Sequence, residues 1–79
     1  MTKGEYRVGI SFNPSMSGTV SDIKQAAARL IDLIETIRLD GQSPERAAEV
    51  ARLKALAQTE IESAAMWAVK AATKPEVEK

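Results

Sequence analysis

Residues 12–24, FNPSMSGTVSDIK, are the part of the chain best suited to holding a small ligand. Phe12 can stack on a nucleobase, Asn13 and Pro14 form a predicted turn, and Lys24 falls in the first turn of the helix that we expect next. The unpaired N–H groups at the start of a helix, together with a nearby lysine, attract phosphate. We therefore take Phe12, Asn13, Pro14 and Lys24 as candidate ligand-binding residues. The same pattern also fits an ordinary helix cap in which Phe12 is a core residue.

The chain lacks the side chains that most enzymes and metal sites need. It contains no cysteine and no histidine, which removes the usual zinc ligands and the commonest general base. The Gly-Lys-Ser/Thr ending of a P-loop is missing from residues 12–24. Two pairs of carboxylates, Asp32 with Glu35 and Glu60 with Glu62, fall on helix faces that we expect to be exposed to solvent. The sequence thus predicts a binding protein rather than an enzyme, with no metal and no cofactor.

Composition predicts a small, electrically neutral domain over residues 1–79. At this length hydrophobic burial barely exceeds the loss of chain entropy, so self-association is the stabilising device that we expect in the absence of disulfides. Eleven basic residues balance eleven acidic ones, which disfavours DNA or RNA polymers as partners. No apolar run of about 18 residues could span a membrane, and the polar start does not resemble a signal peptide. We expect a cytoplasmic protein with no membrane contact.

The fold predicted from the apolar pattern is all-α, an antiparallel hairpin of two helices. The first helix is expected over residues 21–39, where apolar residues recur at steps of three and four, with Thr19 or Ser21 as its N-cap. The second is expected over residues 44–73, because Pro44 suits the first position of a helix and no breaker follows it in this range. The short connection between the two helices implies that they run antiparallel.

Both ends of the chain are expected to lie outside the hairpin. Residues 1–20 are predicted to form a short extended arm and a loop, and residues 74–79 a flexible tail. The arm shows a period-two alternation that is typical of an extended segment with one apolar face. Its apolar members are Tyr6, Val8, Ile10 and Phe12. Such an arm can lie on its own hairpin or cross to a neighbouring chain.

The unequal lengths of the two predicted helices indicate self-association. At 1.5 Å per residue the second helix would be roughly 45 Å long and the first roughly 28 Å. We expect the overhang at residues 63–72, SAAMWAVKAA, where Met66 and Trp67 point to different sides from Val69. One partner helix cannot cover a segment that is apolar nearly all round, so a homo-oligomer is expected. The alternative is that the many alanines only raise the helix propensity of a long monomeric helix.

Three segments of the chain resemble a known family. RVGISFNPS, then VSDIKQAAARLIDLIETIR, then ARLKALAQTEIESAAMWAVKAATKP are similar to the helical-hairpin domain shared by the anti-CBASS and anti-Thoeris signal sponges of phages. The similarity spans roughly residues 7–75. Its most specific parts are DIK in the first predicted helix and the AQTEIESAAMWAVKAATKP ending, which is similar to an Ala-x-Thr and Met-x-x-Val-Lys/Arg-Ala pattern of the anti-CBASS sponge.

The resemblance implies a phage protein that evades immunity by sequestration. It implies a homohexamer of hairpins that binds cyclic dinucleotides such as cyclic GMP-AMP, at interfaces between protomers, without degrading them. Some members also take cyclic trinucleotides or signals derived from ADP-ribose. In the family an arm tyrosine stacks on the base and an early helix lysine meets the phosphate, and by motif position these roles fall on Phe12 and Lys24. Phe12 lacks the tyrosine hydroxyl and lies closer to the lysine along the chain, which leaves the preferred signal open.

Two other classes of function stay open on the residues alone. A structural or interaction module would associate with itself or with a partner helix and bind no small ligand. A nucleic-acid-binding hairpin could use Lys3, Arg7 and Lys24, although the zero net charge disfavours it.

Overall fold

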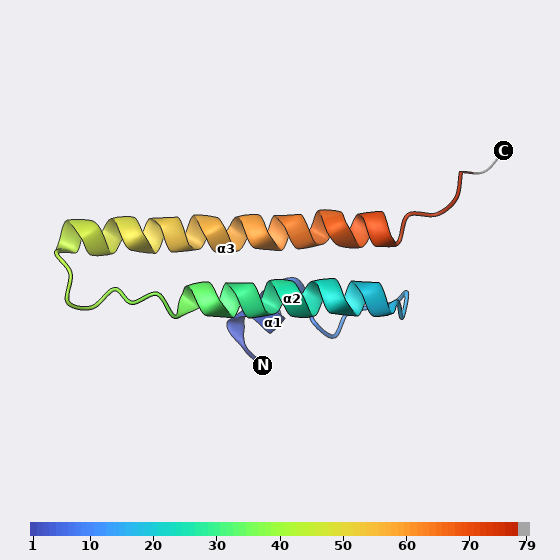
Figure 1. Ribbon diagram of the computed structural model, residues 1–79, viewed down its shortest axis with the longest axis horizontal. Coiled ribbons are helices and arrows are strands. Elements are labelled where there is room, and N and C mark those ends of the chain that lie inside the picture. Colours follow the sequence, from blue (N-terminus) through green and yellow to red (C-terminus); the bar gives the residue numbers. More distant parts are fainter. Residues whose placement is uncertain (78–79) are drawn as a thin grey trace.

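The computed structural model describes residues 1–77, which form three helices and no strand. Helix α1 spans Lys3–Val8, α2 spans Gly18–Glu35 and α3 spans Pro44–Ala72. The two long helices lie side by side and antiparallel, and α1 lies against α2 (Figure 1). The molecule is elongated, with extents of 60 × 26 × 13 Å. The all-helical hairpin predicted from the sequence is confirmed.

The predicted extended arm is wrong for residues 3–8, which form α1. A reciprocal capping box starts this helix: the Thr2 N–H donates to the Glu5 carboxylate at 2.8 Å, and the Glu5 N–H donates to the Thr2 hydroxyl at 3.1 Å. Gly9, in the left-handed region at φ 65°, ends it. These two local signals outweigh a period-two alternation that covers only a few residues.

Helix α2 begins three residues earlier than predicted, at Gly18. Ser17 is its N-cap, and the Ser17 hydroxyl accepts a hydrogen bond from the Val20 N–H at 3.4 Å. Thr19 and Ser21 therefore lie inside the helix, and neither of them caps it.

Helix α2 also ends four residues earlier than predicted, at Glu35. The Lys54 ammonium on α3 donates to the Glu35 carbonyl at 3.1 Å and to the Ile37 carbonyl at 2.6 Å. A side chain from the opposite helix thus satisfies carbonyls at this helix end, four residues before the predicted end at residue 39. The connection to α3 is correspondingly longer, over residues 36–43.

The overhang of the longer helix is at its start, near Pro44, and the prediction that residues 63–72 overhang is wrong (Figure 1). Val20 in the first turn of α2 and Val69 in the last turn of α3 line one cavity, so these two helix ends are level. At the other end Lys54 reaches the last turn of α2, and the turns of α3 that precede it extend past α2. The overhang lies at the start of α3 because α2 both begins and ends earlier in the sequence than predicted.

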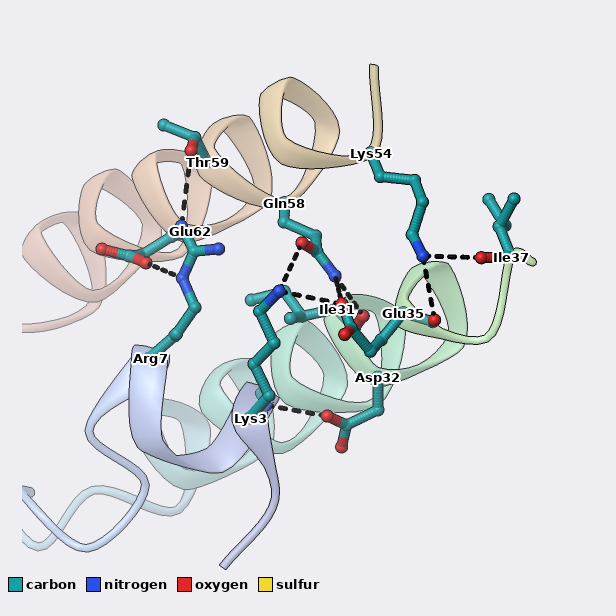
Figure 2. A network of polar contacts seen from close by, with 11 residues as sticks. Lys3, Arg7, Ile31, Asp32, Glu35, Ile37, Lys54, Gln58, Thr59 and Glu62 are labelled. Atoms are coloured by element: carbon teal, nitrogen blue, oxygen red, sulfur yellow. Dashed lines mark hydrogen bonds and ion pairs between the residues drawn. The ribbon is translucent and has the colours of Figure 1, made fainter. Parts of the chain in front are cut away.

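Helix α1 is tied to both long helices by a polar network (Figure 2). The Lys3 ammonium donates to the Glu35 carboxylate at 2.8 Å and to the Gln58 side-chain oxygen at 3.0 Å. Gln58 is buried, and its amide nitrogen donates to the Ile31 carbonyl at 3.1 Å and to the Glu35 carboxylate at 3.0 Å. The hydrogen bonds from Lys3 and from Gln58 lower the pKa of Glu35 to about 2.

The close approach of α1 to α2 depends on a glycine. A Cβ atom at Gly4 would lie 2.1 Å from the carbonyl oxygen of Ala28, too close for any other residue. The Gly4 N–H donates to the Asp32 carboxylate at 2.7 Å. Asp32 and Glu35, expected on a free solvent-facing surface, are therefore both hydrogen-bonded to α1.

A single chain buries few large apolar side chains. The buried apolar residues are Val20, Ala28, Ile31 and Ala65. Met66 and Trp67 are each 67% exposed and Leu33 is 64% exposed. Large apolar side chains left open on this scale are typical of a surface that another chain covers.

In the described part of the chain no helix is both long enough and apolar enough to cross a membrane. Residues 78–79 of the predicted tail lie outside the described residues.

Candidate functional site

The structure brings the four candidate residues together around one cavity of about 210 Å³. The cavity lies where the loop before α2, the first turns of α2 and the end of α3 meet. Its lining comprises Phe12, Asn13, Pro14, Ser15, Val20, Lys24, Val69 and Thr73. The juxtaposition of the four predicted residues is thus a property of the folded chain and not only of their nearness in the sequence.

Lys24 is buried and holds the loop before α2 in place. It is the seventh residue of α2, nearly two turns in, rather than in the first turn as predicted. Its ammonium donates to the Gly9 carbonyl at 2.9 Å and also to the Phe12 carbonyl. Because an ammonium has three donors, these two bonds leave one N–H for a ligand. The main structural role of Lys24 is therefore to hold the loop in place. Its side chain also lines the cavity.

Phe12 presents its ring to the outside. The side chain is 71% exposed, so the alternative that Phe12 is a core residue is wrong. The Lys24 ammonium lies 5.4 Å from the centre of the ring, in cation–π range. An aromatic face that is open to solvent and fixed beside a cation can stack on a planar group that carries a nearby negative charge.

Asn13 and Pro14 shape the loop between α1 and α2. The Asn13 side-chain amide donates to the Ser17 carbonyl at 2.9 Å, and its oxygen accepts from the Ser15 hydroxyl at 2.8 Å. Met16 adopts a left-handed conformation at φ 54°, which is uncommon for a residue with a side chain. This loop is closed by its own hydrogen bonds, and it fixes the position of Phe12 before any ligand arrives.

A second and larger cavity of about 450 Å³ adjoins the first one. Lys24, Val69 and Thr73 line both cavities. The other lining residues are Arg7, Val8, Glu62, Ala65, Met66 and Lys70. Apolar side chains from α1 and α3 thus form much of the wall, with charged groups among them. A volume of this order suits a small organic ligand.

The charged groups of the larger cavity come from three helices. Arg7 on α1 donates through Nε to the Glu62 carboxylate at 2.7 Å, and its Nη2 lies 3.4 Å from the Thr59 hydroxyl (Figure 2). The Lys70 ammonium lies 5.5 Å from the centre of the Trp67 ring. Together with Lys24, the side chains of Arg7 and Lys70 give the cavity a positive character that the neutral chain as a whole does not have.

Three charged residues of the larger cavity were not among the predicted ligand-binding residues. Arg7 lies within RVGISFNPS and Lys70 within AVKAATKP, two stretches that carry the family resemblance. The resemblance assigned no role to either residue. Glu62 was expected on a solvent-exposed helix face, but its side chain pairs with Arg7, which is 55 residues away in the sequence. Only the packing of α1 against the hairpin brings these groups to one place.

Comparison with known proteins gives one family. The family model described as Acb2/Tad1, hairpin domain, matches residues 5–73. Neither the curated proteins nor the solved structures contain a significant match.

Proposed function

Because the chain belongs to the Acb2/Tad1 hairpin family of phage anti-CBASS and anti-Thoeris sponge proteins, we propose that it binds and sequesters a cyclic dinucleotide signal of CBASS-type immunity. The family domain sequesters signals and is not catalytic. We place the protein in the cytoplasm of the infected host cell, where the signal is made. Its action is stoichiometric, because a sponge lowers the free signal concentration by mass action.

The observation that carries this proposal is the meeting of an open aromatic ring, basic side chains and an apolar cavity. Phe12 offers a stacking face, and the Lys24 ammonium lies beside it. Arg7 and Lys70 line the adjoining cavity of about 450 Å³. A cyclic dinucleotide presents flat bases and two phosphodiester charges, which these groups complement. Phe12, Asn13, Pro14 and Lys24 are the ligand-binding residues of this proposal, with Asn13 and Pro14 acting through the shape of the loop.

Self-association is part of the proposal. Met66, Trp67 and Leu33 are more than half exposed in a single chain, and their burial between protomers would stabilise the assembly. A homohexamer is the state that we favour. A two-fold interface in such an assembly would present Phe12 and Lys24 twice to a ligand with two bases and two phosphates.

Native mass spectrometry of the purified protein tests the function directly. The protein is incubated with cyclic GMP-AMP, other cyclic dinucleotides, cyclic trinucleotides and ADP-ribose cyclisation products. We expect a hexamer that gains discrete masses of a cyclic dinucleotide, which is returned unchanged on denaturation. Gain of an ADP-ribose product alone would assign an anti-Thoeris sponge instead. An assembly that gains no mass from any of them would overturn the proposal in favour of a structural module.

Site variants test the assignment of Phe12. Phe12→Ala removes the stacking face and is expected to weaken binding roughly 5- to 150-fold, given about 1–3 kcal/mol for base stacking. Tyr6→Ala is the matched control, because Tyr6 is 77% exposed on α1 and lines neither of the two cavities. Equal affinities of the two variants by calorimetry would remove Phe12 from the site.

A further inference from the structure

The larger cavity contains one carboxylate among its basic groups. Glu62 lies 2.7 Å from Arg7 Nε, and the two side chains are 35% and 24% exposed. Lys24 and Lys70 line the same cavity. A site that serves only to attract an anion gains nothing from a carboxylate, since this group repels the ligand and occupies one of the arginine donors.

The carboxylate sets the charge of the site. Arg7, Lys24 and Lys70 contribute three positive charges and Glu62 contributes one negative charge, which leaves a formal excess of two. A cyclic dinucleotide carries two negative charges, one on each phosphodiester. When water opens one of these diesters, the product carries a terminal phosphate monoester of about two charges at neutral pH, and about three charges in total. The linear product therefore exceeds the charge that the cavity balances.

We propose, on the basis of the proposed function, that Glu62 is a specificity-determining residue of the sponge. Its carboxylate disfavours ligands with more than two negative charges, so that the intact cyclic signal is bound in preference to its linear hydrolysis product. Discrimination of this kind uses a repulsive group against the wrong ligand. The binding sites of the sponge therefore stay available for the cyclic signal, which is still active, and are not occupied by the linear product.

The same ion pair also joins α1 to α3, so a purely structural role must be separated from a role in selectivity. Glu62→Gln removes the charge and keeps an oxygen that can accept from Arg7. The matched control is Glu60→Gln, which removes the same charge two residues away at an exposed position that lines neither cavity. A structural role predicts loss of stability without a change in ligand preference.

The experiment measures the affinities of cyclic GMP-AMP and of its singly hydrolysed linear form for each protein by calorimetry at low ionic strength. We expect Glu62→Gln to shift the ratio of the two affinities on the order of tenfold toward the linear form, while Glu60→Gln leaves it unchanged. Comparing ratios between proteins cancels the difference in shape between the two ligands. An unchanged ratio in Glu62→Gln would overturn the assignment of Glu62.

A second variant covers the case in which Glu62→Gln does not fold. Lys70→Gln lowers the positive charge at an exposed position of the same cavity, and it is expected to shift the ratio in the opposite direction, toward the cyclic form. An unshifted ratio in this variant would likewise contradict selection by charge. If the wild-type protein binds neither form of cyclic GMP-AMP nor any other cyclic dinucleotide, the proposed function itself fails, and this outcome is distinct from binding without selectivity.

Discussion

The Lys24 ammonium donates a hydrogen bond to the carbonyl oxygen of Phe12 and lies 5.4 Å from the centre of the Phe12 ring. One buried cation thereby fixes both the backbone and the aromatic face of the same residue. Because Lys24 also bonds to the Gly9 carbonyl, the end of α1, the loop and α2 meet at this ammonium group. A change at Lys24 therefore affects the stability of the loop as well as any ligand.

Replacing Lys24 by methionine keeps the aliphatic stem and removes both hydrogen bonds. We expect the free energy of unfolding to fall by about 1–3 kcal/mol, because two carbonyl groups lose a charged donor. Urea unfolding measures this change. Arg29→Met on the same helix is the control, since Arg29 is exposed and its loss should cost little. Equal stabilities of the two variants would show that the Lys24 bonds do not hold the loop.

A methyl group at position 4 should detach α1. In Gly4→Ala the new Cβ would lie 2.1 Å from the Ala28 carbonyl oxygen, and backbone on both sides must shift to relieve the clash. We expect a loss of about 1–3 kcal/mol and faster amide hydrogen exchange in residues 3–8. Exchange measured by mass spectrometry reports both effects.

Gly18→Ala is the matched control for this prediction. A Cβ atom at Gly18 has no neighbour within 4 Å, and Gly18 is the first residue of α2. Alanine there should be neutral or slightly stabilising. Similar exchange rates in the Gly4 and Gly18 variants would mean that the close packing of α1 does not require glycine.

The stability of the protein should fall in acid partly through Glu35. The ordinary pKa of a glutamate side chain is 4.5, and hydrogen bonds from Lys3 and then from Gln58 lower the pKa of Glu35 to about 2 in the folded chain. A lowered folded pKa means that this stabilisation is complete above pH 4.5 and is lost as the pH falls toward about 2.

Glu35→Gln should therefore make the free energy of unfolding less dependent on pH between about 2 and 4.5. Chemical unfolding at a series of pH values measures this dependence. Glu60→Gln serves as the comparison, because Glu60 is exposed on α3. If both variants follow the wild-type curve, the Lys3–Glu35 contact contributes nothing in this range.

Trp67 reports on self-association, because it is the one tryptophan of the chain and is 67% exposed in a single protomer. Assembly through this end of α3 should bury the indole ring, so we expect its fluorescence to shift to shorter wavelength as protein concentration rises. Sedimentation velocity on the same samples should show the larger species. A monomer mass with the emission of an exposed indole at every concentration would contradict the proposed assembly.

The hairpin was predictable because its signals are long and redundant. Apolar residues recur at helical spacing through α2, and Ser43-Pro44 marks the start of α3 locally. The start of α1 could also have been predicted, since Thr2 and Glu5 have the spacing of a capping box, but the alternation of apolar residues after it favoured an extended arm. The end of α2 was not readable, because the donor at its last carbonyls is Lys54 of another helix.

The candidate site was predictable only in its local part. Phe12, Asn13, Pro14 and Lys24 fall within one short stretch, and they line one cavity in the fold. The burial of Lys24 could not be read from its place among polar residues, because α1 and the loop cover that face of α2. The charged groups of the larger cavity come together only through a contact between α1 and α3. Because Arg7 and Glu62 are 55 residues apart, no local sequence pattern predicts this contact.

The two basic residues of α1 are four positions apart, and so are their partners on α3. Lys3 meets Gln58 and Arg7 meets Glu62, so the two contacts are one helical turn apart on both elements. If α3 slid by one turn in one direction, Lys3 would face Lys54. A slide in the other direction would place Glu62 opposite Lys3 and leave Arg7 facing Met66 with no carboxylate partner. The contacts of the short first helix thus favour one register of α3 over the two registers that are shifted by one turn. Repulsion between Lys3 and Lys54 disfavours the first of these, and the unpaired charge of Arg7 disfavours the second.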